Sequence, residues 1–199
     1  MTSDLALGID PDTTTPAFAL LQSRGPHRPP NVLWAGIAWP QDPKAPVEQR
    51  IVSLAREIGL ISNRYFHFVD VAVVESQRKY PQDKVDANDL IHLGQVAGIC
   101  MAAANGAVTA PPERGKLLAP YPAQWKGNAD KKIMQARYLK RVGFDSVDEF
   151  LKGEFPGRET IVRKGLASHV IDAIGLAWWG FEQVAPQSIP QVRRYGSAA

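Results

Sequence analysis

The chain has little cysteine, little net charge and no long apolar run, and each shortage excludes a class of protein. Cys100 is the single cysteine in 199 residues, so no disulfide can form within the chain, which is typical of a reducing cytoplasm. The longest apolar stretch, near residues 96–104, is well short of the roughly 20 residues that span a membrane. No basic start leads into an apolar core as in a secretory signal. We expect a cytoplasmic protein without membrane association.

The composition is that of an ordinary globule, with 45% hydrophobic and 22% charged residues. We expect one domain over residues 1–185 and a loosely ordered basic tail over residues 186–199. A net charge of +3 is a weak sign of nucleic-acid binding, but basic residues gather in predicted loops and at helix starts, where a phosphate backbone can reach them. For any single one of them, a solvated surface is the favoured explanation. They include Arg78, Lys79, Lys84, Arg114, Lys116, Lys126, Lys131, Lys132, Arg137, Lys140, Arg141, Arg158, Arg163, Lys164, Arg193 and Arg194.

Hydrophobic periodicity and turn residues predict an ordered series of strands and helices. Three short strands, 5–10, 16–22 and 32–39, precede a helix at 46–64 and a strand that ends at Glu75. A helix at 87–105 stopped by Gly106, a short strand at 117–119, a helix at 128–142 stopped by Gly143 and a last helix at 159–184 follow. This is the order of the α/β ribonuclease-H-like fold, a mixed five-stranded sheet flanked by helices. The first and fourth strands should then be neighbours, which brings Asp10 and Glu75 together.

Three acids stand where the surrounding residues predict burial. Asp10 closes Leu5-Ala6-Leu7-Gly8-Ile9-Asp10, Glu75 ends a β-branched run, and Asp172 lies in an apolar helix. Each alone has an ordinary explanation, as a turn-shaping residue, a partner of a nearby Arg, or a buried salt-bridged residue. Three carboxylates at one point need a cation, which predicts a divalent-metal site. His169, three residues before Asp172, shares its helix face and can serve as a metal ligand or as an acid–base group.

Five stretches in order resemble the RuvC family of Holliday junction resolvases. They are Gly8-Ile9-Asp10-Pro11, Val74-Glu75-Ser76, Leu93-Gly94-Gln95-Val96-Ala97-Gly98, Pro122-Ala123-Gln124-Trp125-Lys126-Gly127 with Asp130-Lys131, and His169-Val170-Ile171-Asp172-Ala173. Together they span residues 5–180.

The resemblance implies a homodimeric endonuclease that cuts four-way DNA junctions with two Mg²⁺ or Mn²⁺ ions per site. By the same resemblance, Asp10, Glu75, His169 and Asp172 would be the catalytic and metal-binding residues, and Lys126 and Lys131 would contact the DNA backbone. A bacterial cell or a phage-infected host would be its setting. The small residues Ala97, Gly98 and Ala102–Ala104 offer either a close-packed dimer surface or ordinary core.

Two positions depart from the family pattern. Asp12 stands where the family usually has glycine, and we interpret it as a turn residue. The family commonly places a junction-wedging aromatic residue after the glutamate, whereas here Arg78 and Lys79 precede Tyr80. We predict that Arg78, Lys79 and Tyr80 contact DNA, and that Tyr80 stacks on a base.

Two other functions fit part of the sequence. Gly8-Ile9-Asp10 followed by Thr13-Thr14-Thr15 is similar to the first phosphate loop of actin-like and sugar-kinase-like ATPases, but 199 residues leave no room for the second domain that such ATPases need. A second alternative is a scaffold that holds branched DNA or a protein partner without cutting, although a pure binder gains nothing from acids that repel phosphates.

Overall fold

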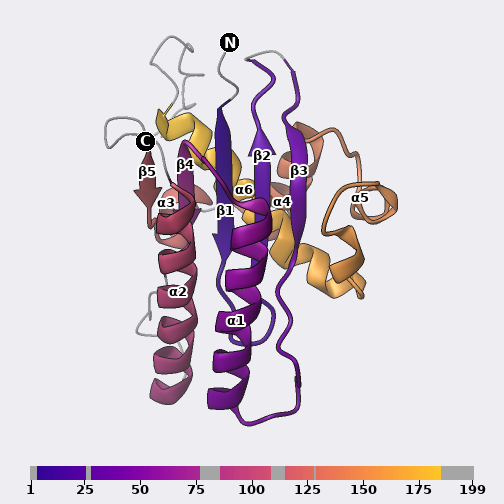
Figure 1. Ribbon diagram of the computed structural model, residues 1–199. Helices are drawn as coiled ribbons and strands as arrows, with labels where there is room; N and C mark the ends of the chain where they lie inside the picture. The colour runs from indigo at the N-terminus through magenta and orange to yellow at the C-terminus, as the bar shows by residue number, and fades with distance from the viewer. Residues whose placement is uncertain (1–3, 26–27, 77–85, 109–114, 128, 185–199) are drawn as a thin grey trace, which may run out of the picture.

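A five-stranded sheet with helices on both faces forms the centre of the computed structural model, which describes residues 4–25, 28–76, 86–108, 115–127 and 129–184 (Figure 1). The meander β1 (Leu5–Asp10), β2 (Ala17–Gln22) and β3 (Asn31–Ile37) is antiparallel, whereas β4 (Val71–Val74) and β5 (Lys116–Leu118) run parallel to β1. The strand order is β3-β2-β1-β4-β5. The predicted mixed sheet is confirmed, with β1 and β4 as neighbours.

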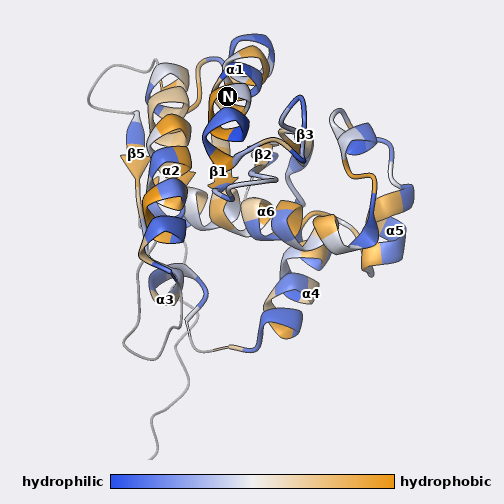
Figure 2. Ribbon diagram, turned by 90° about the horizontal axis from the view of Figure 1, so that it is seen from below, coloured by the Kyte–Doolittle hydropathy of each residue, from blue (hydrophilic) through white to orange (hydrophobic). Residues whose placement is uncertain are grey.

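The two faces of the sheet are covered by different helices. The helices α1 (Val47–Tyr65) and α2 (Ala87–Ala107) lie on one face, and α6 (Lys164–Val184) lies on the other (Figures 1 and 2). On β4, Val71 and Val73 join the core under α6, whereas Ala72 and Val74 join the core under α1 and α2. Because side chains alternate along a strand, the next position on the α6 side is Glu75.

Several helix boundaries differ from the sequence prediction. Gly106 does not stop the second helix, which continues to Ala107. The helix α4 (Lys131–Arg141) begins at Lys131 because the Asp130 carboxylate accepts a hydrogen bond of 2.9 Å from the Lys132 amide and caps it. The last helix begins at Lys164, and a separate 3₁₀ turn (Arg158–Thr160) stands where we expected its start.

Two short helices were not predicted. The helix α3 (Pro122–Trp125) begins with proline, and the side-chain oxygen of Gln124 accepts a hydrogen bond of 2.7 Å from the Tyr121 amide. The helix α5 (Val147–Lys152) is capped by Ser146, whose hydroxyl accepts from the Glu149 amide at 3.1 Å. Both starts carry the usual signals, an N-terminal proline and a Ser-x-x-Glu pattern, but the helices are too short to give an amphipathic period.

The helix α2 buries one side and leaves an apolar side open. Val96, Cys100, Ala104 and Ala107 pack into the core, but only 22% of its most apolar 18-residue window is buried. Among the described helices, α2 alone is long and apolar enough to cross a membrane by length and composition. A single such helix is weak support for a membrane span, because core helices of soluble proteins pass the same test.

Candidate active site at the ends of β1 and β4

Asp10 and Glu75 meet where the parallel strands β1 and β4 end. The Glu75 amide donates a hydrogen bond of 3.0 Å to the Ile9 carbonyl, which extends the β1–β4 pairing to the two acids. Both side chains are buried, with 8% of Asp10 and 4% of Glu75 exposed. Burial, followed by the charge of Asp10 and a hydrogen bond with it, raises the pKa of Glu75 from 4.5 to about 7, although Lys126 and its positive charge work in the opposite direction. Glu75 therefore holds its proton to a higher pH than a free glutamate does.

The helix α6 brings His169 and Asp172 to the same place because it lies directly against β1. A Cβ atom on Gly8 would stand 2.0 Å from the Ala173 carbonyl oxygen, so only glycine permits this approach. The Nδ1 atom of His169 lies 3.1 Å from Oδ2 of Asp10. That hydrogen bond raises the pKa of His169 above its usual range, although burial lowers it. His169 thus keeps its positive charge to a higher pH than a free histidine.

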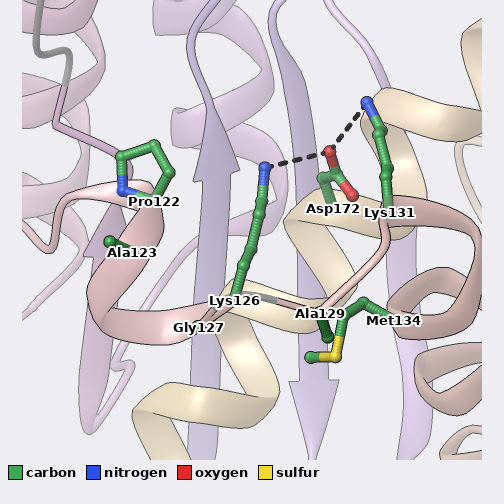
Figure 3. Close-up of a pocket in the computed structure, with 8 residues that line it drawn as sticks. All are labelled: Pro122, Ala123, Lys126, Gly127, Ala129, Lys131, Met134 and Asp172. Atoms are coloured by element: carbon green, nitrogen blue, oxygen red, sulfur yellow. Dashed lines mark hydrogen bonds and ion pairs between the residues drawn. The ribbon is translucent and has the colours of Figure 1, made fainter. Parts of the chain in front are cut away.

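Lys126 and Lys131 neutralise Asp172 from two sides (Figure 3). Lys126 follows α3, and its Nζ lies 3.3 Å from Asp172 Oδ2 and 3.5 Å from Glu75 Oε1. Lys131 is the first residue of α4, and its Nζ lies 3.2 Å from the same Asp172 oxygen. Burial alone would lower the pKa of Lys126, but the charges of Glu75, Asp172 and Asp10 outweigh it, and the pKa is raised. Lys126 also lies over the ring of Trp125, 4.5 Å from its centre.

A cleft of about 380 Å³ opens beside these groups. The charged residues Lys126, Lys131 and Asp172 line it, as do the apolar residues Pro122, Ala123 and Met134 (Figure 3). A phosphodiester suits such a cleft, because its anionic oxygens would meet two ammonium groups.

The donor set suits a hard divalent ion, since it offers three carboxylates and one imidazole. Among the described residues, however, no three His, Cys, Asp or Glu side chains lie close enough together to hold one ion. The cation that Glu75 and Asp172 contact is the ammonium group of Lys126. Asp172 is thus a buried residue with salt bridges to Lys126 and Lys131, which is the ordinary explanation that the sequence left open for it.

Of the other residues that the sequence singled out, Asp12 lies within the described residues and three predicted DNA contacts lie outside them. Asp12 is a turn residue as predicted, because its Oδ1 accepts hydrogen bonds from the amides of Thr14 and Thr15 at 2.7 and 2.8 Å. Arg78, Lys79 and Tyr80 lie outside the described residues, so their contact with DNA stays a prediction.

The sequence did not point to Gln135, whose side-chain amide donates to Oδ1 of Asp172 at 3.1 Å. Its one signal is its position four residues after Lys131, which places both on the same side of α4.

No family model and no curated protein matches the chain. Solved structures do match. A Thermus thermophilus RuvC structure aligns with a TM-score of 0.62 and 19% identity over 90% of this chain and 95% of that one. The T. thermophilus RuvC in complex with Holliday junction substrate aligns with a TM-score of 0.62 and 17% identity over 91% and 96%. The predicted RuvC-like, ribonuclease-H-like fold is therefore confirmed; at this identity, the likeness shows the fold alone.

Proposed function

We propose that the protein is a metal-dependent, structure-selective DNA endonuclease that resolves four-way junctions by paired phosphodiester cleavage, in the cytoplasm of a bacterial cell or a phage-infected host. The observation that carries the proposal is the network at the ends of β1 and β4, in which His169 pairs with Asp10, Lys126 joins Glu75 to Asp172, and Lys131 also contacts Asp172. A solved structure with the same fold is a RuvC in complex with Holliday junction substrate, which supports branched DNA as the ligand.

Asp10, Glu75, Asp172 and His169 would hold the two Mg²⁺ or Mn²⁺ ions. A pair of such ions supplies an activated water and charge stabilisation on the attacking and leaving oxygens. Since Lys126 contacts both Glu75 and Asp172, those two carboxylates would have to exchange an ammonium partner for an ion. Because burial and Asp10 raise the pKa of Glu75 to about 7, ion binding at this carboxylate should release a proton near neutral pH.

The residues of the chain itself have separate tasks in this reaction. Lys126 and Lys131 line the cleft and would hold the phosphodiester against the acids. His169 donates toward Asp10 when it is protonated, so it fixes that carboxylate and can exchange a proton at Nδ1. The apolar lining residues Pro122, Ala123 and Met134 would contact the sugar and base next to the bound phosphate.

Cleavage of a synthetic four-way junction with Mg²⁺ tests the proposal. The wild type should give paired nicks, and Asp10→Asn and Glu75→Gln should lose at least a hundredfold in rate while still binding the junction. Asp42→Asn, at an exposed acid before α1, is the matched control and should cleave like the wild type. Full-rate cleavage by folded Asp10→Asn or Glu75→Gln protein would remove these residues from the reaction.

We further propose that two copies associate through the open side of α2. Gly94, Gly98 and Ala102 are exposed and four residues apart, and no atom lies within 4 Å of a Cβ placed on either glycine. Ile91, on the same helix, has 58% of its surface exposed. Such a face allows a second helix to approach closely, and two matched cuts across a junction suit a two-fold dimer.

Sedimentation analysis tests the dimer with a matched pair of variants. Ile91→Glu should give a monomer, whereas Val52→Glu, at a 72% exposed valine on α1, should leave the dimer intact. A wild type that remains monomeric at micromolar concentration, alone and with a junction, would refute this part of the proposal.

The pairing of Asp172 with two lysines also favours a second function, a branched-DNA-binding module that does not cut. Such a protein would use the lysines for phosphates and the acids only to hold the lysines in place. Junction binding without cleavage across titrations of both Mg²⁺ and Mn²⁺ would select this function over the first.

A further inference from the structure

The side-chain amide of Gln135 joins α4 to α6 beside the candidate site. Its Nε2 atom lies 3.1 Å from Asp172 Oδ1, 3.1 Å from the Ser168 carbonyl oxygen and 2.8 Å from Ser168 Oγ. A backbone carbonyl and a carboxylate only accept hydrogen bonds, so the nitrogen end of this amide must face them. The orientation of Gln135 is therefore fixed by two different acceptors.

The two oxygens of Asp172 have different partners as a result. Oδ1 accepts from Gln135, whereas Oδ2 faces Lys126 and Lys131 at 3.3 and 3.2 Å. The terminal torsion of an aspartate is broad and roughly two-fold, so the side chain alone does not select one orientation of the carboxylate plane. Asp172 is only 3% exposed, which leaves little water to compete for Oδ1. Gln135 is the neutral donor that holds Oδ1 and leaves Oδ2 directed at the two lysines.

We propose that Gln135 is a positioning residue, which orients the Asp172 carboxylate for the ions and so sets the metal affinity of the site. The inference rests on the proposed metal-dependent function. Donors that hold a liganding carboxylate from behind typically change metal affinity or activity by 10- to 100-fold. Gln135 has no direct contact with the phosphodiester in this role.

A purely structural role would give a different pattern. If Gln135 only fastened α4 to α6, its two contacts with Ser168 would be the important ones. Ser168→Ala removes one of them and leaves the hydrogen bond to Asp172 in place. Gln135→Met keeps the length and approximate shape of the side chain but removes every donor. These two variants therefore separate the positioning of Asp172 from the joining of the helices.

The experiment measures Mn²⁺ binding by calorimetry on the full-length protein without DNA. We expect Gln135→Met to weaken Mn²⁺ binding 10- to 100-fold and to shift the Mn²⁺ concentration for half-maximal junction cleavage by a similar factor. Junction affinity in EDTA should not change. Ser168→Ala should weaken Mn²⁺ binding less than Gln135→Met does, and Gln49→Met, the same change at an exposed residue of α1, should have no effect.

The opposite results would contradict either the positioning role of Gln135 or the proposed function. Mn²⁺ binding by Gln135→Met within twofold of the wild type, or an equal loss in Ser168→Ala, would overturn the positioning role. If Gln135→Met does not fold, Gln135→Asn is measured instead; its amide is one carbon shorter and should give the same direction of change. A wild type that binds no Mn²⁺ and cuts no junction would overturn the proposed function itself, and this inference with it.

Discussion

Glu75→Gln should make the metal-free protein more stable, and the gain should grow with pH. In the folded protein, burial and the nearby Asp10 raise the pKa of Glu75 from 4.5 to about 7. The folded state therefore binds this proton more tightly than the unfolded state does, so the stability of the wild type falls as pH rises between these two values. A glutamine of the same shape has no proton to lose and avoids this cost.

The size of the effect follows from the pKa. One pKa unit corresponds to about 1.4 kcal/mol, so a rise from 4.5 to about 7 corresponds to about 3 kcal/mol of stability above pH 7. The loss of the contact with Lys126, whose Nζ lies 3.5 Å away, is already included, because that lysine lowers the pKa and is outweighed. We expect almost no difference between variant and wild type below pH 4.5.

Urea unfolding in EDTA at pH 5, 6, 7 and 8 measures this difference. Glu154→Gln, at an exposed glutamate, is the control and should stay within about 0.5 kcal/mol of the wild type at every pH. A Glu75→Gln gain that is flat with pH, or a wild type that is the more stable protein at pH 8, would refute the reasoning. The same variant should lose junction cleavage, so stability and activity would change in opposite directions.

Three further predictions concern the contact between β1 and α6, the pairing of His169 with Asp10, and the proposed DNA-binding surface. Gly8→Ala should cost about 3 kcal/mol or more, because its Cβ would meet the backbone of Ala173 and Ala177, whereas Gly59→Ala has open space and should be stabilising in thermal unfolding. His169→Asn should lower the free energy of unfolding most below pH 6.5, and this loss should shrink as the pH rises through the raised pKa of His169. Urea unfolding across pH 5 to 9 measures the loss, and a loss that is independent of pH would contradict the pairing with Asp10. The helix α4 carries three exposed basic residues that form no ion pair among the described residues, namely Lys132, Arg137 and Lys140. Replacing all three by serine should reduce the steepness of log affinity against log salt concentration for junction DNA by roughly 2 to 3. The same change at Arg24, Arg28 and Arg56 is the control and should leave the slope unaltered.

The sequence was informative where local pattern and fold order agree. The period of α1 and the β-branched run of β4 gave the layers, and the order of elements put Asp10 next to Glu75. The short helices α3 and α5 were missed because four and six residues do not complete an amphipathic period. Gly106 was misread because the helix continues one residue past it, to a buried Ala107.

The electrostatics of the site were harder to predict than its carboxylates. Lys126 was predicted as a DNA contact, yet its ammonium group also contacts two of the acids. Nothing in the local pattern fixes where a flexible four-carbon side chain ends. Gln135 was missed for a related reason: its role depends on the packing of α4 against α6, and sequence spacing indicates only that it shares a face with Lys131.

The contact between His169 and Asp10 joins residues that are 159 positions apart in the chain. Asp10 ends β1, the first strand of the described chain, whereas α6 is its last helix, so the two partners are synthesised at different times. A partly synthesised chain, or one cut before residue 164, would carry two of the four acidic and imidazole groups and lack the others. Under the proposed function, the site therefore cannot assemble before α6 has been synthesised, and a chain that lacks α6 should not cut DNA.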